Sequence, residues 1–441
     1  MMLTLVVFAV AVVLWTCTPL DDTFVALAAV VVLLLFGVLP ASALAVLGGS
    51  TTWLLIAAFV LAGGVTASGL PARLATSLTG RARSVRGLLH LTAFALLLTA
   101  FLVPSTSGRA ALALPVHGAL RERVNSRVSR ALGVLFPSVI LLTAVATLVG
   151  AGAHLITSAL LEQATGEGIG FGQWLVLGLP LALVSAHVTA EVVLWLFTTR
   201  ADRAERLGLD ESTLVTAVWS EGPAAVGALA VPKVVRPHLA GLTRSELAAL
   251  AILAVVSAAW LTEPWHHVPP EVTALAGAIA ITTPRLGVTT LKQAMAEIPW
   301  SLLLFMAATT MLGTALVGSG AAATIAGLIS PSHLLPTVVV VSLAAHLVVQ
   351  SRSARSSVLI PIVIPLALAA GMNPAALAFA STAAAGFCHT FTSSAKPVAL
   401  FADAYRPRDL LKLSAVLAPI TGALVLACAV LLWPHLGLPL K

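Results

Sequence analysis

Hydrophobic residues run along this chain in long, nearly unbroken segments, and polar residues gather between them. The segments lie at about 3–20, 23–40, 51–69, 88–103, 110–120, 131–164, 172–199, 245–262, 269–284, 298–318, 335–350, 356–370, 373–402 and 409–433. Runs of this length predict membrane-spanning helices of roughly 20 residues, not the ~10-residue alternating strands of a barrel. The pattern therefore predicts an all-α polytopic membrane protein.

Composition excludes a soluble protein. Of the 441 residues, 59% are hydrophobic and only 9% are charged, whereas soluble domains carry about 25% charged residues. The three cysteines, Cys17, Cys388 and Cys428, fall inside apolar segments, so we expect neither a disulfide framework nor a metal site. The N-terminal run lacks a basic region and leads into another apolar run, so we expect a retained span and not a cleaved signal peptide.

The basic residues are unevenly placed. Nineteen of the 24 Lys and Arg residues lie in the stretches 73–86, 121–130, 200–244, 285–292 and 406–412. Because cytoplasmic loops carry an excess of Lys and Arg, these stretches are expected to face the cytoplasm. The resulting count is ten full spans with both termini outside, in the inner or plasma membrane. Besides the C-terminal Lys441, four basic residues remain within apolar sequence: Arg109, Arg352, Arg355 and Lys396.

One polar motif occurs twice inside apolar sequence, at Ser105–Arg109 and at Ser351–Arg355. Each copy reads hydroxyl, any residue, hydroxyl, small residue, arginine, with a proline six positions after the arginine. Arginine deep in a membrane segment is costly and marks a functional site by default. Two arginines in matched contexts, 246 positions apart, indicate one site built from two related halves, as in secondary transporters.

The motif copies divide the chain into two repeats. Short apolar segments flank each copy, so we interpret 88–121 and 335–370 as re-entrant helical hairpins with the motif at the tip. The predicted organisation is a first repeat at 1–199, a cytoplasmic linker at 200–244 and a second repeat at 245–441. Each repeat has five transmembrane helices plus one hairpin. An odd number of spans inverts the second repeat, so one hairpin enters from the cytoplasm and the other from outside, and the tips meet near the midplane.

With the hairpins placed, the chain resembles the divalent anion:sodium symporter family of di- and tricarboxylate and sulfate carriers. Ser105-Thr106-Ser107 and Ser351-Arg352-Ser353 stand where that family has Ser-Asn-Thr tips. Gly170 to Pro180 and Gly371-Met372-Asn373-Pro374 match further family segments. The resemblance implies a secondary anion transporter with an elevator-type movement, breaks in the spans near 151–154 and 393–397, and a homodimer.

The resemblance also implies that the tips ligate sodium and hold the carboxylate of the substrate, but both tip asparagines are replaced here. Thr106 occupies one position and Arg352 the other, and His154 and Lys396 replace the asparagines at the two breaks. Since a guanidinium cannot ligate Na⁺, we expect built-in positive charge to stand in for bound sodium. Coupling to sodium is then reduced or absent, leaving exchange or proton-coupled transport. No cofactor is expected.

The predicted substrate is a small multivalent anion such as citrate, a dicarboxylate or sulfate. Hydroxyl donors, helix N-termini and arginines that grip an oxyanion with two hydrogen bonds are suited to it. The candidate substrate-binding residues are Ser105, Thr106, Ser107, Arg109, His154, Ser351, Arg352, Ser353, Arg355, Ser393, Ser394 and Lys396.

Alternative interpretations remain open. Arg109 and Arg355 could bond the carbonyls of a broken helix end, Arg352 could hold its hairpin, Lys396 could be a stand-in cation, and His154 a polar residue at a kink. His187 and Glu191, four residues apart, could relay protons or pair within the bundle. His346 and His389 are expected to be hydrogen-bonded packing residues.

Competing functions are a Na⁺-coupled dicarboxylate or sulfate symporter and an uncoupled anion uniporter or channel. An enzyme is not expected, because no catalytic or phosphate-binding motif occurs.

Overall fold

In the computed structural model, residues 1–18, 20–103, 105–208, 214, 241–284, 287–320 and 333–441 are described. The named elements of this part are helical, as the long apolar runs predict. The helices of the first half are α1 (Met2–Cys17), α2 (Asp22–Leu35), α3 (Ser50–Ser68), α4 (Leu70–Thr79), α5 (Val85–Leu102), α6 (Thr106–Arg121), α7 (Ser126–Thr143), α8 (Gly152–Thr165), α9 (Phe171–Phe197) and α10 (Arg200–Ala204). Those of the second half are α12 (Arg244–Leu261), α13 (Glu263–His266), α14 (Pro270–Thr282), α15 (Leu291–Ala296), α16 (Trp300–Gly318), α18 (Leu334–Ala344), α19 (Arg352–Ala369), α20 (Pro374–Ala385), α21 (Lys396–Leu400) and α22 (Pro407–Ala427).

Helix lengths differ from the ten full spans that the sequence predicted. In the described part of the chain, eight helical segments are long and apolar enough to cross a membrane, and α5 and α19, two predicted hairpin arms, are among them. Four other predicted crossings are shorter: α1 has 16 residues, α2 has 14, α14 has 13 and α20 has 12. Length alone therefore does not separate a hairpin arm from a full span.

The two breaks predicted at the motif copies are present. Helix α5 ends at Leu102 and α6 begins at Thr106, while α18 and a short 3₁₀ turn end at Leu347 and α19 begins at Arg352. The serine just before each second arm is its N-cap: Ser105 accepts a hydrogen bond from the Gly108 amide, and Ser351 accepts one from the Ala354 amide. The hydroxyl-rich motif thus starts a helix for an ordinary local reason.

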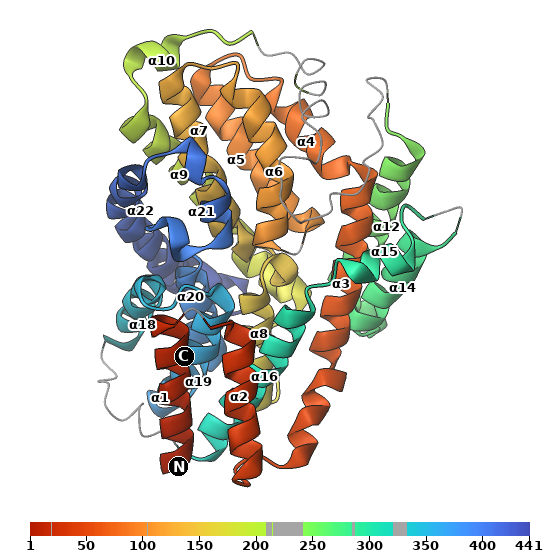
Figure 1. Ribbon diagram of the computed structural model, residues 1–441, viewed down its shortest axis with the longest axis vertical. Helices are drawn as coiled ribbons and strands as arrows, with labels where there is room; N and C mark the ends of the chain where they lie inside the picture. Colours follow the sequence, from red (N-terminus) through yellow and green to blue (C-terminus); the bar gives the residue numbers. More distant parts are fainter. Residues whose placement is uncertain (19, 104, 209–213, 215–240, 285–286, 321–332) are drawn as a thin grey trace.

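Helix contacts are paired between the two halves. Both α5 and α6 pack against α7, and both α18 and α19 pack against α20. Helix α8 packs on α19 of the other half, and α21 packs on α6. The third predicted span of each half also contacts the other half, since α3 packs on α14 and α16 packs on α2. Figure 1 shows α3, α12 and α14 grouped on one side of the molecule, with α4 to α7 at its upper end.

Parts of the predicted organisation fall outside the described residues. The linker predicted at 200–244 is described only at 200–208, 214 and 241–244.

The polar cluster on α5 and α9 differs from the predicted pairing of His187 with Glu191. His90 of α5 lies between the two: its Nδ1 is 2.9 Å from His187 Nδ1, and its Nε2 is 2.6 Å from Glu191 Oε1. Arg86 donates two hydrogen bonds to the same carboxylate oxygen, at 2.9 and 2.6 Å. Glu191 is therefore held by α5, because a carboxylate near apolar sequence needs a cationic partner.

One buried ion pair joins α4 to α12. Arg73 Nη1 lies 2.9 Å from Glu246 Oε2, and this carboxylate also accepts a hydrogen bond of 2.7 Å from the Thr243 amide. Replacing Glu246 with alanine is expected to lower the free energy of unfolding by about 1–3 kcal/mol, because it removes a helix cap and leaves Arg73 unpaired. Thermal denaturation of the purified protein in detergent measures this. Arg73→Ala, which keeps the cap, should lower the melting temperature less, and equal effects would contradict a capping contribution.

Candidate functional site

The first hairpin tip presents hydroxyl groups beside a fully buried arginine. Thr106 and Ser107 form the first turn of α6 and are partly buried, as is Ser105. The first amides of a helix have no partner within it, so this turn offers unpaired N–H groups as well as hydroxyls. One turn further, the side chain of Arg109 has no solvent exposure.

Arg109 is enclosed by hydrogen-bond acceptors. Its Nε donates to Thr99 Oγ1 at 2.9 Å and its Nη2 to Leu96 O at 2.6 Å, both on α5. On α7, Nη1 donates to Ile140 O at 2.9 Å and Nη2 to Thr143 Oγ1 at 2.8 Å. Ile140 lies in the last turn of α7, where carbonyls lack helical partners. Arg109 thus joins α5, α6 and α7, the structural alternative considered from the sequence.

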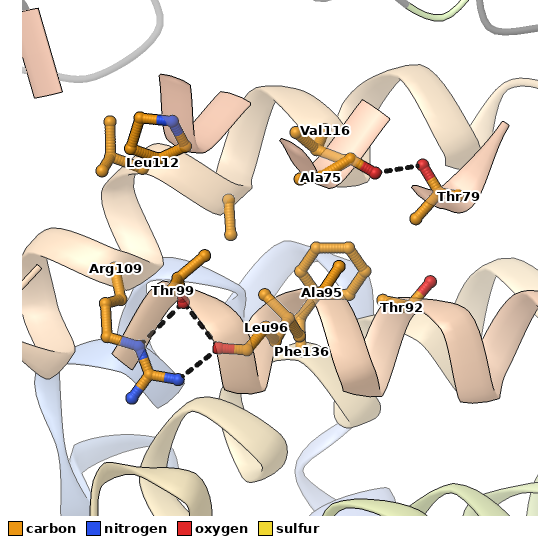
Figure 2. Close-up of a pocket in the computed structure, with 12 residues that line it drawn as sticks. Ala75, Thr79, Thr92, Ala95, Leu96, Thr99, Arg109, Leu112, Val116 and Phe136 are labelled. Carbon is orange, nitrogen blue, oxygen red and sulfur yellow. Dashed lines mark hydrogen bonds between the residues drawn. The ribbon is translucent and has the colours of Figure 1, made fainter. Parts of the chain in front are cut away.

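The space next to Arg109 is too small for a carboxylic acid substrate. Figure 2 shows the guanidinium turned toward the Leu96 carbonyl and Thr99, at one end of a crevice between α4, α5, α6 and Phe136. The volume of this crevice is about 10 Å³, which holds at most one water molecule. These contacts support the structural alternative for Arg109, while its role as a substrate ligand stays a prediction.

The second hairpin tip reaches the first predicted helix break and the end of α20. Arg352 Nη1 donates to Leu141 O at 3.3 Å, and its Nη2 lies 3.5 Å from His154 Nε2 at the start of α8. Gly386, just after α20, lies so close that an added Cβ would be 2.9 Å from the same Nη2. Ser353 lies so close to Gly152 that an added Cβ there would be 3.2 Å from the serine Oγ. The tip of one half therefore meets the break of the other.

Arg355 is as buried as Arg109 but has no partner. Its side chain has no solvent exposure, and its Nε, Nη1 and Nη2 all lack a hydrogen-bond partner among the described residues. Arg352 lies close enough to repel both Arg109 and Arg355. The two arginines at equivalent positions of the repeated motif thus differ in hydrogen bonding. The guanidinium of Arg109 donates to acceptors of the protein, whereas the donors of Arg355 are unpaired among the described residues.

The sequence explains this asymmetry. Arg109 uses the hydroxyls of Thr99 and Thr143. The residues 246 positions after them are Ala345 and His389, so neither hydroxyl has a counterpart in the second half. His389 itself is fully buried, and neither of its ring nitrogens has a hydrogen-bond partner in the described part of the chain. The prediction that His389 is a hydrogen-bonded packing residue is wrong, whereas that for His346 is confirmed by its bonds to Leu343 O and Thr390 Oγ1.

The remaining candidates lie at the two breaks. His154 is fully buried, bonded through Nδ1 to Thr147 O at 3.0 Å and stacked on Trp174. Ser394 accepts a hydrogen bond of 2.9 Å from the Phe391 amide, which closes the turn before α21. Ser393 and Lys396 are exposed. The first break thus lies against the Arg352 side chain, while the second presents Lys396 at the surface.

The chain is similar to known proteins in sequence and in fold. A family profile described as citrate transporter matches residues 11–384. The chain belongs to the citrate transporter family. A protein of Cupriavidus necator named "Membrane protein" is 24% identical over 423 residues, which are 91% of this chain and 78% of that protein. The crystal structure of the Alcanivorax borkumensis YdaH transporter matches with a TM-score of 0.55 at 18% identity, covering 99% of this chain and 98% of the other; this likeness concerns the fold alone.

The family match confirms three expectations from the sequence. The protein is a transporter and not an enzyme, it is a multi-pass integral membrane protein, and the resemblance to di- and tricarboxylate carriers is borne out at the level of the citrate transporter family.

Sequence reasoning missed several residues that shape the site of this transporter. Thr99 and Thr143 accept hydrogen bonds from Arg109, but no pattern in the sequence distinguishes them from other helical residues. Asp22, at the start of α2, interacts with the Ser351 hydroxyl and with Lys396. The only sequence feature that could have drawn attention to Asp22 is the pair Asp21-Asp22 ahead of an apolar run. In the described parts of the chain, no group of three or more His, Cys, Asp or Glu side chains is arranged to hold a metal ion.

Proposed function

We propose that this transporter is a secondary active carrier of small multivalent anions, citrate first among them, and that the anion binds against Arg355. The observation that carries the proposal is the unpaired, fully buried guanidinium of Arg355. A buried charge without a partner is strongly destabilising, and a carboxylate that enters the site removes that cost. The citrate transporter family supports a tricarboxylate or dicarboxylate as this anion.

The surroundings of Arg355 suit a multivalent anion. Arg352 and Arg355 lie in the first turn of α19, where the positive end of the helix dipole adds to their charge. No salt bridge to either arginine is present among the described residues. Several carboxylates on one substrate could contact both arginines and the hydroxyls of Ser351 and Ser353. We propose Arg352 and His154 as the boundary of this site toward the first half.

We further propose that the halves at 1–199 and 245–441 are inverted repeats, each with five spans and one hairpin, and that transport follows an elevator-type movement. The paired contacts support this: each hairpin packs on the following helix, and the helix after each break packs on the hairpin of the other half. Breaks with unsatisfied backbone near a cavity are typical of such carriers. A homodimer in the cell membrane, as expected from the resemblance, remains part of the proposal.

Sodium is proposed to contribute little to coupling, because Arg352 places a fixed cation at the tip of the second hairpin. In proteoliposomes, citrate uptake is expected to be saturable, stimulated by citrate on the opposite side, and nearly unchanged when Na⁺ is replaced by choline. A sodium-coupled carrier would lose roughly 5–150-fold in apparent affinity on the same replacement. Such a loss would overturn the sodium proposal, and uptake without trans-stimulation, accompanied by ohmic current, would identify a channel or uniporter instead.

A further inference from the structure

Three arginines surround an open pocket at the turn between α4 and α5. Arg81, Arg83 and Arg206 line it together with Gly80, Ala82 and Leu207, and its volume is about 480 Å³. This size falls within the range of small-molecule sites, about 300–1,000 Å³. Neither the tip of the first hairpin nor that of the second contributes a lining residue, so the pocket is separate from the proposed transport site.

Backbone contacts fix the two sides of the pocket relative to each other. Ser84 and Arg206 form an isolated antiparallel bridge, and the Leu207 amide donates to the Arg83 carbonyl at 3.1 Å. The segment that carries Arg206 follows α10, whose N-terminus is capped by Thr199 and Asp202. The backbone at Arg206 is therefore held beside the α4–α5 turn.

The cap on α10 is present at neutral pH. Asp202 accepts hydrogen bonds from the Thr199 hydroxyl and amide, at 2.7 and 2.8 Å, and from Asn125 Nδ2 at 3.0 Å. The hydrogen bonds from Thr199 hold the pKa of Asp202 below its usual value. A carboxyl with a lowered pKa keeps its charge and its stabilising bonds as long as the pH stays above that range.

Among the described residues, none with an acidic side chain lines the pocket to offset the charge of its arginines. In the described segments, the salt bridges of arginine are made by Arg73, Arg86 and Arg127, none of which is a lining residue. Three guanidinium groups around one opening repel one another and favour an anion between them. Arginine binds phosphate oxygens with two parallel hydrogen bonds, so three arginine residues in the lining suit a phosphate-bearing anion.

We propose that this pocket binds a phosphate-bearing anion, and that its source is the headgroup of an anionic phospholipid. The pocket lies where α4 and the first hairpin arm α5 meet, and α5 is long and apolar enough to cross a membrane. The turn belongs to the arginine-containing stretch 73–86, which is expected to face the cytoplasm. Figure 1 shows α4, α5 and α10 toward the same end of the molecule. Basic pockets between transmembrane helices on the cytoplasmic side are suited to anionic lipid headgroups.

The test compares three full-length proteins in detergent: the natural chain, the triple variant R81Q/R83Q/R206Q, and the charge-matched control R121Q/R200Q/R408Q. The control removes three exposed arginines that do not line the pocket. Each protein is titrated with dioctanoyl-phosphatidylglycerol, dioctanoyl-phosphatidylcholine and inorganic pyrophosphate. Native mass spectrometry counts the bound molecules, and thermal denaturation reports the stabilisation that binding produces.

The natural chain and the control are expected to retain phosphatidylglycerol over phosphatidylcholine. The triple variant is expected to bind it roughly 100-fold more weakly, since each basic residue near an anionic surface contributes about fivefold. If the triple variant and the control retained phosphatidylglycerol equally, the proposal that this pocket binds the lipid would be wrong. Binding of pyrophosphate without phosphatidylglycerol would overturn the lipid as the source. Because the citrate uptake assay is separate, these outcomes do not depend on the transport proposal.

Discussion

Replacement of Arg355 with glutamine is expected to weaken citrate binding strongly while leaving the ligand-free protein at least as stable as the natural chain. Removing one partner of a buried, hydrogen-bonded charge pair costs about 2–5 kcal/mol, which weakens binding roughly 30- to 5,000-fold. Stability is expected to persist because the three unpaired donors of Arg355 contribute no hydrogen bonds to the folded state. Titration of citrate by calorimetry and thermal denaturation without citrate measure the two effects.

The two readouts distinguish a ligand from a structural residue. A fold-supporting arginine would lower the melting temperature of the ligand-free protein when replaced, whereas a ligand lowers only the increase that citrate produces. Arg355→Lys is a conservative comparison, since it keeps the charge but loses the planar fork, and it should restore part of the affinity. Citrate binding of natural strength in Arg355→Gln would contradict the proposed site.

Replacement of Arg109 with glutamine is expected to have the opposite result, a large loss of stability. The side chain donates four hydrogen bonds to acceptors on α5 and α7. A shorter amide cannot reach all of them, and buried acceptors left without a donor cost about 1–3 kcal/mol each. The expected loss is about 3–5 kcal/mol, the range for breaking a buried charge network. Thermal denaturation in detergent and the yield of monodisperse protein measure it.

The folded fraction of the Arg109→Gln protein provides the internal control. Its citrate affinity should be close to natural, because the crevice beside Arg109 has no room for an anion. A stable Arg109→Gln protein that no longer binds citrate would reverse the assignment of the two arginines. Matched substitutions at equivalent positions of the two halves therefore test the asymmetry directly.

Much of the site could be predicted because its parts are local. The repeated serine-containing motif predicted two helix starts, and Ser105 and Ser351 are the N-caps of α6 and α19. The breaks near His154 and Lys396 followed from composition and from the family resemblance, and both are present. These features depend on residues within one helical turn of each other, which a sequence displays directly.

Features that depend on packing were not predicted. The arms α5 and α19 were interpreted as hairpin arms partly because the apolar segments there are short, yet each helix has 18 residues. The pairing of His187 with Glu191 was expected from their spacing, but His90 on another helix lies between them. Helix spacing describes one face of one helix and says nothing of the neighbour that packs on it.

The sequence by itself determined that this chain is a helical membrane protein with two matched arginines buried in apolar surroundings, because length and hydropathy of a segment decide whether it enters the bilayer. Only the tertiary structure decided which of these two arginines has no hydrogen-bond partner among the described residues. The acceptors that enclose Arg109 come from α5 and α7, 10 to 34 positions away, and their absence around Arg355 depends on how helices distant in sequence meet. A buried cation stabilises the fold where protein acceptors surround it and can bind an anion where they do not. The packing of the helices determines which acceptors are present.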